Sequence, residues 1–242
     1  MAKLRVHNIE SGPASSDVAF GISGDTVAVS SDSLKLNTWK DSGGNTLFQS
    51  DGAGTLSNVN STFSGAGPKL ILSQTATGSA SISFTANIDN TYDHYMFVCT
   101  DIGPATDTAF FTFQGSTDSG SNYNVTITTT KFTSTHAEDN SSASIGYDTG
   151  GDTAQGTGFQ RLTTDMANEA DASGAGILHL FSPSSTTYVK HFYTRFNHMV
   201  SHDGITETFI GGYFNTTSAI DAIQFKTSSG NFDGKIKMYG IS

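Results

Sequence analysis

Apolar and polar residues alternate along the chain from Pro68 onward, in runs rich in Phe, Tyr, Ile, Val and Thr. Successive side chains of an extended strand point to opposite faces, so this alternation predicts strands with one buried and one solvated face. We expect strands at residues 69–74, 80–85, 92–101, 109–116, 124–132, 176–181, 188–200, 206–214, 219–227 and 234–240. Short strands separated by turn residues, with almost no helical periodicity, predict an all-β chain that forms an antiparallel sandwich, and they favour a jelly roll.

Three segments depart from this simple pattern. Residues 160–172 have a composition compatible with a helix, so this stretch is interpreted as a short helix or an ordered loop. The apolar residues between Ile220 and Phe225 slip out of phase, which suggests a bulge. Residues 133–158 are dominated by Ser, Thr, Asp and Gly, and a connection this long is typical of a functional or surface loop.

Before Pro68 the character of the chain is different. Short β-like stretches alternate with turn-forming sequences such as Ser42-Gly43-Gly44-Asn45, in which Gly accepts positive φ. These stretches have few large apolar side chains to bury, so the segment is expected to need a partner chain or a docking surface. We therefore predict two parts, an amino-terminal segment at residues 1–67 and a sandwich domain at residues 68–242.

Charge and composition exclude several classes of protein. The net charge is -10, charged residues make up 14% of the chain, and no block of basic residues is present, so binding to nucleic acid through counterion release is not expected. The single Cys99 lies in an apolar run and excludes an intrachain disulfide framework. The first residues lack the apolar stretch of a signal peptide and no window is long enough for a spanning helix, so we expect synthesis in a cytoplasm without membrane insertion.

The residues give little support to catalysis or to a bound cofactor. A nucleophile elbow, a phosphate-binding glycine loop and a polar, activated Cys are all absent from the sequence. His198 and His202 would share one face only if their strand continued past Ser201, whereas His202-Asp203-Gly204 is typical of a turn. We therefore expect no zinc site, no cofactor and no enzymatic activity.

Two acidic loops are weak candidates for calcium, because carboxylate oxygens close in sequence and a nearby Gly suit that ion. The candidate ligands are Asp118 and Asn122 in one loop and Asp148 and Asp152 in the other. Neither loop has the ligand number or the terminal Glu of an EF-hand, and a plain turn capped by Asx side chains is the favoured interpretation.

Aromatic residues within the predicted strands could stack on sugars, but most are expected to form the core. The set consists of Phe110, Phe111, Phe113, Tyr188, Phe192, Tyr193 and Phe196. A glycosidase would also need two facing carboxylates, and the sequence places no such pair. A jelly-roll enzyme or lectin acting on carbohydrate remains an alternative from a different functional class.

Residues 1–11 (MAKLRVHNIES) and 23–65 (SGDTVAVSSDSLKLNTWKDSGGNTLFQSDGAGTLSNVNSTFSG) are similar to amino-terminal segments of tail fibres and related virion appendages of tailed bacteriophages, especially of marine and cyanobacterial hosts. Residues 209–242 (FIGGYFNTTSAIDAIQFKTSSGNFDGKIKMYGIS) resemble the closing strands of a β-sandwich domain common in phage structural proteins. The resemblance implies a homotrimeric, non-enzymatic virion protein that is attached to the particle by its amino-terminal part.

These expectations name partners and candidate sites. The leading hypothesis is a short tail fibre or adhesin that contacts host polysaccharide or protein, and the alternative is a capsid decoration or head-fibre protein. Contacts with other virion proteins are expected through Lys3, Arg5, Val6 and Ile9. Host-surface contacts are expected in the loops that contain Glu138, Tyr147, Asp148, His202 and Asp203.

Overall fold

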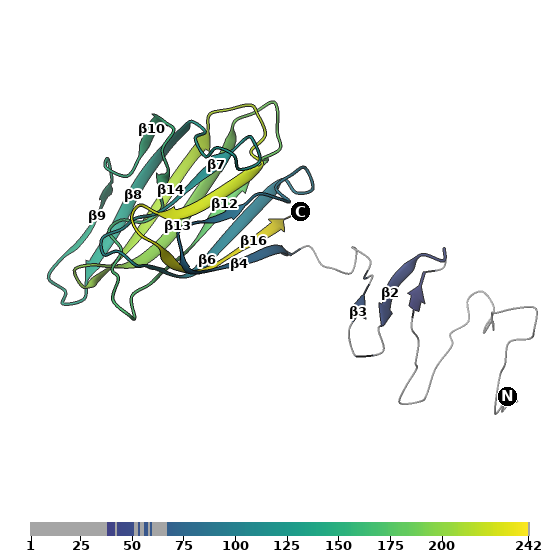
Figure 1. Ribbon diagram of the computed structural model, residues 1–242, viewed down its shortest axis with the longest axis horizontal. Coiled ribbons are helices and arrows are strands. Elements are labelled where there is room, and N and C mark those ends of the chain that lie inside the picture. The colour runs from purple at the N-terminus through teal and green to yellow at the C-terminus, as the bar shows by residue number, and fades with distance from the viewer. Residues whose placement is uncertain are drawn as a thin grey trace, which may run out of the picture. The chain divides into compact units, whose positions relative to one another are not determined.

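A computed structural model describes residues 38–41, 43–50, 53, 56–57, 59 and 67–241. The chain divides into two compact units, Met1–Gly65 and Ala66–Ser242. The described residues form strands, turns and bends and no helix (Figure 1). The all-β prediction is therefore confirmed, and each unit is described separately below.

The described part of the first unit is a small antiparallel sheet. Its strands are β1 (Thr38–Lys40), β2 (Thr46–Ser50) and β3 (Leu56–Ser57), in the order β1-β2-β3. The turn between β1 and β2 is held by Asp41, whose Oδ1 accepts the backbone N–H groups of Gly43 and Asn45 at 2.8 Å. The Trp39 and Phe48 rings stack across the two strands with centroids 5.4 Å apart.

The second unit is an antiparallel sandwich of a nine-stranded and a four-stranded sheet. The larger sheet contains β4 (Lys69–Ser79), β6 (His94–Pro104), β8 (Ile127–Ala137), β9 (Ala143–Tyr147), β10 (Thr153–Gly156), β12 (Gly174–Phe181), β13 (Lys190–Val200), β14 (Gly204–Phe214) and β16 (Phe232–Ile241). The smaller sheet contains β5 (Ile82–Phe84), β7 (Phe111–Ser116), β11 (Gln160–Arg161) and β15 (Ala222–Thr227). All ten strands expected from the alternation are present, with shifts of a few residues at their ends.

Eight of these strands pair in the nested order of a jelly roll. The first of them, β4, pairs with the last, β16, and the second, β5, pairs with the seventh, β15. The third, β6, pairs with the sixth, β12, and the fourth, β7, pairs with the fifth, β11. This nesting places β4, β16, β6 and β12 in one layer and β5, β15, β7 and β11 in the other, as in a two-sheet jelly roll.

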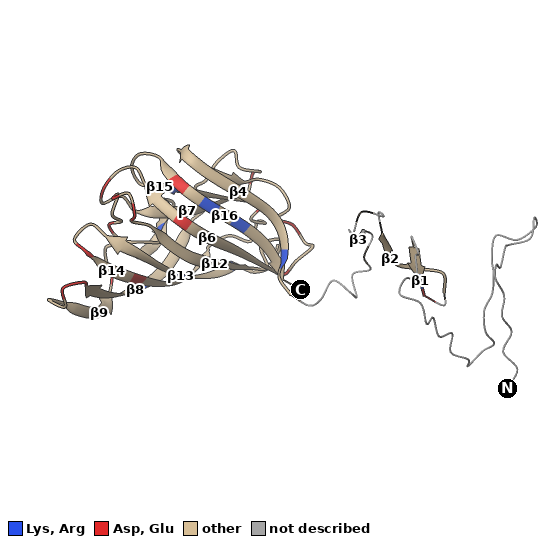
Figure 2. Cartoon of the chain, turned by 90° about the horizontal axis from the view of Figure 1, so that it is seen from below, with Lys and Arg blue, Asp and Glu red and all other residues tan. Residues whose placement is uncertain are grey.

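The remaining strands are two insertions that widen one layer. The first insertion, β8 to β10, comes between β7 and β11, and the second, β13 and β14, comes between β12 and β15. Because β13 pairs with β12 and β14 pairs with both β13 and β8, the insertions continue the sheet beyond β12 in the order β12-β13-β14-β8. The result is a broad sheet with a large solvent-facing side, called the outer face below (Figure 2).

Phenylalanine rings fill the space between the two layers. Phe111 and Phe225, neighbours in the small sheet, stack with centroids 5.8 Å apart, and Phe113 meets Phe192 of the large sheet edge to face at 5.1 Å. Aromatic pairs of this kind contribute about 0.5–1.5 kcal/mol each beyond their buried area. Cys99 is buried in the same core, and burial raises the pKa of its thiol, which confirms its interpretation as a structural residue.

The three segments that depart from simple alternation form strands and a loop. Residues 133–158 are not one long loop, because β8 continues to Ala137 and β9 and β10 pair back onto it. Of the short helix or ordered loop considered at residues 160–172, the loop is confirmed: β11 is followed by a loop in which Met166 forms isolated β-bridges to Ala109 and Val200. The suspected bulge in 219–227 is wrong, since β15 runs in unbroken register from Ala222 and the preceding apolar residue lies outside the strand.

Candidate binding face on the nine-stranded sheet

Strict alternation in β13 separates two sets of side chains. Its burial pattern alternates along the whole strand, so Phe192 and Phe196 lie in the core while Tyr193 and Arg195 lie on the outer face. Solvent-facing strand positions are expected to be polar, yet Tyr193 is 48% exposed and Phe132, on β8, is 41% exposed. An outer face that carries aromatic side chains is a candidate for a binding surface.

Directly paired residues form a row across six strands of this face. The row, called the central row below, consists of Lys237, Val98, Ile177, Arg195, Phe209 and Phe132, from β16, β6, β12, β13, β14 and β8. At one end Phe209 and Phe132 stack with centroids 4.7 Å apart, and the guanidinium of Arg195 lies 5.3 Å from the Phe209 centroid. The central row therefore begins with an ammonium group, crosses two aliphatic side chains and ends on stacked rings.

A second group of rings lies beside the central row. His179 is the direct cross-strand partner of Tyr193, and their rings stack with centroids 4.5 Å apart. His94 stacks on Phe181 at 4.6 Å, and its Nε2 lies 2.8 Å from Nδ1 of His179. Burial lowers the pKa of both imidazoles, and the mutual repulsion of their protonated forms lowers that of His179 further, so this patch is neutral at pH 7.

A hollow of about 440 Å³ lies over the central row, with His179 and Tyr193 on one side of it and Asn197 and Glu207 on the other. Short side chains of Val98, Thr100 and Ala175 line it together with the larger His179 and Tyr193, and its polar groups come from Arg195, Asn197 and Glu207. The size falls within the usual range for a small-ligand site, and a few polar groups among apolar ones is the usual composition of such sites. Glu207 is the one carboxylate in this lining, and it is paired with the Nε of Arg195.

A second cluster of titratable residues lies inside the sandwich. Lys131 on β8 is 1% exposed, and its ammonium donates to the Thr163 carbonyl at 3.0 Å and contacts the Asp148 carboxylate at 3.1 Å. Burial lowers the pKa of Lys131, and the charge of Asp148 partly offsets that effect. The nearby His198 accepts a hydrogen bond from the Thr164 backbone at 3.3 Å and lies 2.9 Å from the hydroxyl of that residue, so the cluster fastens the 162–166 segment to the large sheet.

The carboxylates of the calcium candidates Asp118, Asp148 and Asp152 are engaged by other groups of the protein. Asp118 accepts from the backbone and the side-chain amide of Asn122 at 2.9 and 2.6 Å, and these bonds hold the pKa of Asp118 below its usual value. Asp152 accepts from the Tyr147 hydroxyl at 2.8 Å, and Asp148 is the partner of Lys131. Within the described residues, no group of three or more His, Cys, Asp or Glu is arranged to hold a metal ion.

The histidines considered for zinc do not meet. His198 is buried on the inner face of β13, which ends at Val200, while His202 lies in the following turn with its Nδ1 3.7 Å from the Asp165 carboxylate. That turn was expected from the sequence and is confirmed. The prediction that a strand break separates the two rings is therefore correct.

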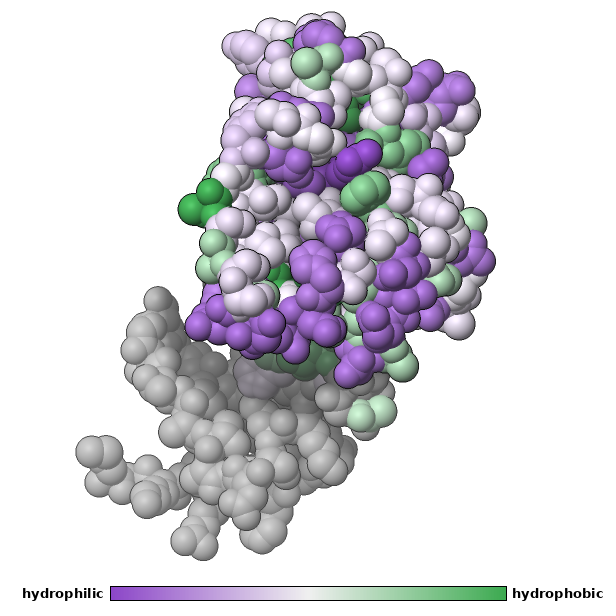
Figure 3. All heavy atoms as spheres, turned by 90° about the vertical axis from the view of Figure 1, so that its left-hand side faces the viewer, coloured by the Kyte–Doolittle hydropathy of each residue, from purple (hydrophilic) through white to green (hydrophobic). Residues whose placement is uncertain are grey.

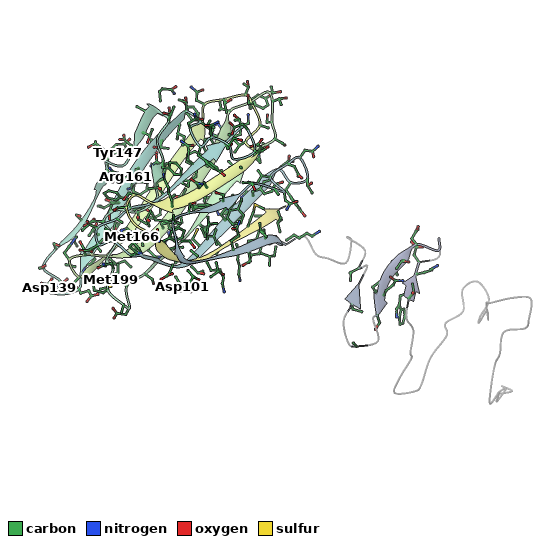
Figure 4. All side chains as sticks on the ribbon, viewed as in Figure 1. Asp101, Asp139, Tyr147, Arg161, Met166 and Met199 are labelled. Carbon is green, nitrogen blue, oxygen red and sulfur yellow. The ribbon has the colours of Figure 1, made fainter. Side chains whose placement is uncertain are left out.

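Two of the expected surface loops are neighbours. The backbone N–H of Glu138 donates to the Asp203 carbonyl at 3.0 Å, so the turns after β8 and after β13 lie together, and hydrophilic side chains prevail at this end of the sandwich (Figure 3). Tyr147 and Asp148 lie at the other end of β9, away from the turn that contains Asp139 (Figure 4). The structure thus separates the predicted loop residues into two places, and their host contact stays a prediction.

The sequence-based residue lists overlap the candidate face only in part. Four of the seven aromatic residues considered for sugar stacking are core residues, as expected: Phe111, Phe113, Phe192 and Phe196. Tyr193 belongs to the outer face, whereas its neighbours His179 and Arg195 were not identified. The alternation in the sequence places Tyr193 and Arg195 on the side opposite the core residues, and this pattern could have identified both as outer-face residues. The attachment candidates Lys3, Arg5, Val6 and Ile9 lie outside the described residues.

Comparison with known proteins gives no match: no family model, curated protein or solved structure is significantly similar to this chain. Among the residues that the structure describes, there is no helix with the length and apolar character needed to cross a membrane.

Proposed function

We propose that this chain is a non-enzymatic virion appendage protein of a tailed bacteriophage whose sandwich binds host-surface polysaccharide on its outer face. The phage assignment rests on the resemblance of residues 1–11, 23–65 and 209–242 to virion proteins of that kind. The location of the binding site rests on one observation, the hollow between the His179–Tyr193 stack and the Arg195–Glu207 pair.

The side chains around the hollow suit a sugar better than a large protein surface. The ring of Tyr193 offers an apolar plane for the C–H side of a pyranose, and Asn197, Arg195 and Glu207 offer donors and acceptors for its hydroxyls. The contact area is small and shallow, which fits a short stretch of a polymer. Glycoside hydrolysis needs two carboxylates flanking the bond, so the single Glu207 in this lining favours binding without cleavage.

A panel of purified neutral and acidic polysaccharides tests the binding function. We expect binding to at least one of them, loss of that binding in Tyr193→Ala, and unchanged binding in Tyr188→Ala, a matched change of a tyrosine that is 73% exposed outside the outer face. The proposed function is wrong if no polysaccharide binds, or if Tyr193→Ala binds as the wild type does. Release of reducing ends from a bound polysaccharide would refute the non-enzymatic assignment.

Imaging of intact particles labelled with an antibody to this chain tests the appendage assignment. Label at the tail supports a fibre or adhesin. Label distributed over the head instead supports the capsid decoration or head-fibre alternative.

A further inference from the structure

We propose that the polysaccharide bound by the outer face is acidic, with its carboxylate or sulfate groups held by Lys235, Lys237 and Arg195. This inference rests on the proposed function and adds the chemical class of the ligand. It follows from where the basic residues of the sandwich lie, from their spacing across the hollow and from the free donors of Arg195.

The outer face gathers three cations although the chain as a whole is acidic, and it also carries the acidic residues Glu207 and Asp233. The net charge is -10, yet the burial patterns place Lys235 and Lys237 on the outer side of β16 and Arg195 on that of β13. Glu207 is the one acidic residue on the two directly paired rows that pass through Lys237 and Asn197. The cations offset the carboxylates on this face, so an anionic ligand meets less repulsion here than at the rest of the acidic chain.

Of the five other basic residues of the sandwich, four are unavailable for this role, and the fifth, Lys69, begins the edge strand β4. Lys131 and Lys190 are buried, at 1% and 0% exposure. Arg161 and Lys226 belong to the four-stranded sheet, and each lies over an aromatic ring there, at 4.1 and 4.0 Å from the ring centroids. The arrangement on the outer face is thus a local concentration of charge within a chain that has few cations.

The spacing of the cations fits a chain of sugars. Lys237 and Arg195 are the two charged members of the central row, separated by Val98 and Ile177 on the intervening strands. Three interstrand steps of about 4.8 Å place these backbone positions roughly 14 Å apart. That distance is too long for one anionic group to bridge, but it suits successive charged residues of a polymer whose uncharged ring faces lie on the apolar floor between them.

Arg195 keeps donors available for such a ligand. Its Nε donates to Glu207, while the structure gives its two terminal amino groups no hydrogen-bond partner among the described residues. The side chain of Arg195 is 67% exposed, and its position over Phe209 and beside Glu207 restrains the guanidinium plane. A guanidinium fixed in this way can donate two parallel hydrogen bonds to one carboxylate or sulfate.

The test compares dextran sulfate with dextran, which share a backbone, and adds alginate as a source of carboxylates. Binding is measured by calorimetry at low and at moderate salt. We expect dextran sulfate or alginate to bind at least about tenfold more tightly than dextran, with an affinity that falls as salt rises. If sulfated dextran binds and alginate does not, the face recognises sulfate; the reverse result assigns carboxylate.

Charge-removing variants locate the effect. Lys235→Gln combined with Lys237→Gln is expected to weaken binding of the acidic polymer about tenfold, since each exposed ion pair contributes modestly. Lys226→Gln, a lysine of the other sheet, is the matched control and is expected to bind as the wild type does. Circular dichroism melts confirm that all variants are folded.

The possible failures are distinguishable. Equal affinity for dextran and dextran sulfate, or normal binding by the double lysine variant, refutes acidic recognition; if Tyr193→Ala still abolishes binding, polysaccharide binding on this face stands. Absence of binding to every polymer overturns both proposals. Equally tight binding to a single-stranded oligonucleotide would also refute the assignment to polysaccharide.

Discussion

His198 makes the stability of the sandwich depend on pH in a predictable way. Its ring lies on the inner face of β13 at 1% exposure, and its Nδ1 has no hydrogen-bond partner in the described part of the chain. Burial lowers the pKa of His198 from 6.5 to about 4, and the positive charge of Lys131 adds to this effect. The folded protein therefore keeps the imidazole neutral at pH values where the unfolded chain protonates it.

The direction of this pH dependence follows from proton linkage. Between pH 6.5 and pH 4 the unfolded state binds the proton and the folded state does not, so lowering the pH favours unfolding. The stabilisation is complete above pH 6.5 and is lost as the pH falls toward 4. At about 1.4 kcal/mol per pKa unit, His198 alone removes about 2 kcal/mol of the free energy of unfolding between pH 7 and pH 5.

Urea denaturation of the wild type and of His198→Gln at pH 7, 6 and 5 measures this effect. Between pH 7 and pH 5 we expect the free energy of unfolding to fall by about 2 kcal/mol more for the wild type than for His198→Gln, because Gln does not titrate. His94 and His179, whose pKa values burial also lowers, are present in both proteins, so their contribution cancels. Equal slopes for the two proteins, or an NMR titration of His198 near pH 6.5, would refute the reasoning.

Three further predictions concern packing, charge and assembly. Gly176→Ala should destabilise the sandwich by about 1–3 kcal/mol, because its Cβ would lie 2.3 Å from Cγ of Phe196, while Gly211→Ala, whose nearest neighbour would be 3.8 Å away, should change the melting temperature much less. Asp148→Asn should destabilise the protein more than Lys131→Met does. Asp148→Asn leaves the Lys131 ammonium, which is 1% exposed, without its counter-charge, whereas Lys131→Met leaves the Asp148 carboxylate, which is 26% exposed and can be hydrated. Chemical denaturation of both variants measures the order. Light scattering should give the mass of a homotrimer for the full chain, and a monomer at micromolar concentration would contradict that prediction.

Much of the fold could be predicted because the relevant signal is local. Ten strands of the sandwich were predicted from their residue patterns, most clearly β13 between His191 and Val200, and the turn at His202-Asp203-Gly204 follows from its residue types. The prediction of a long loop at residues 133–158 was wrong for a physical reason. The Ser and Thr side chains of this segment are compatible with either a loop or a strand, and β9, exposed along its whole length, forms a strand because β8 offers a partner.

The candidate site depended on tertiary structure. Alternation alone determined that Tyr193 and Arg195 lie on the face opposite Phe192 and Phe196, because neighbouring side chains of a strand must point to opposite sides. It could not determine that Arg195 meets Ile177 on one side and Phe209 on the other, since the register between strands is set by hydrogen bonds that join distant parts of the chain. The sequence by itself thus decided which face each residue occupies, and the nested pairing of the strands decided which residues share a site.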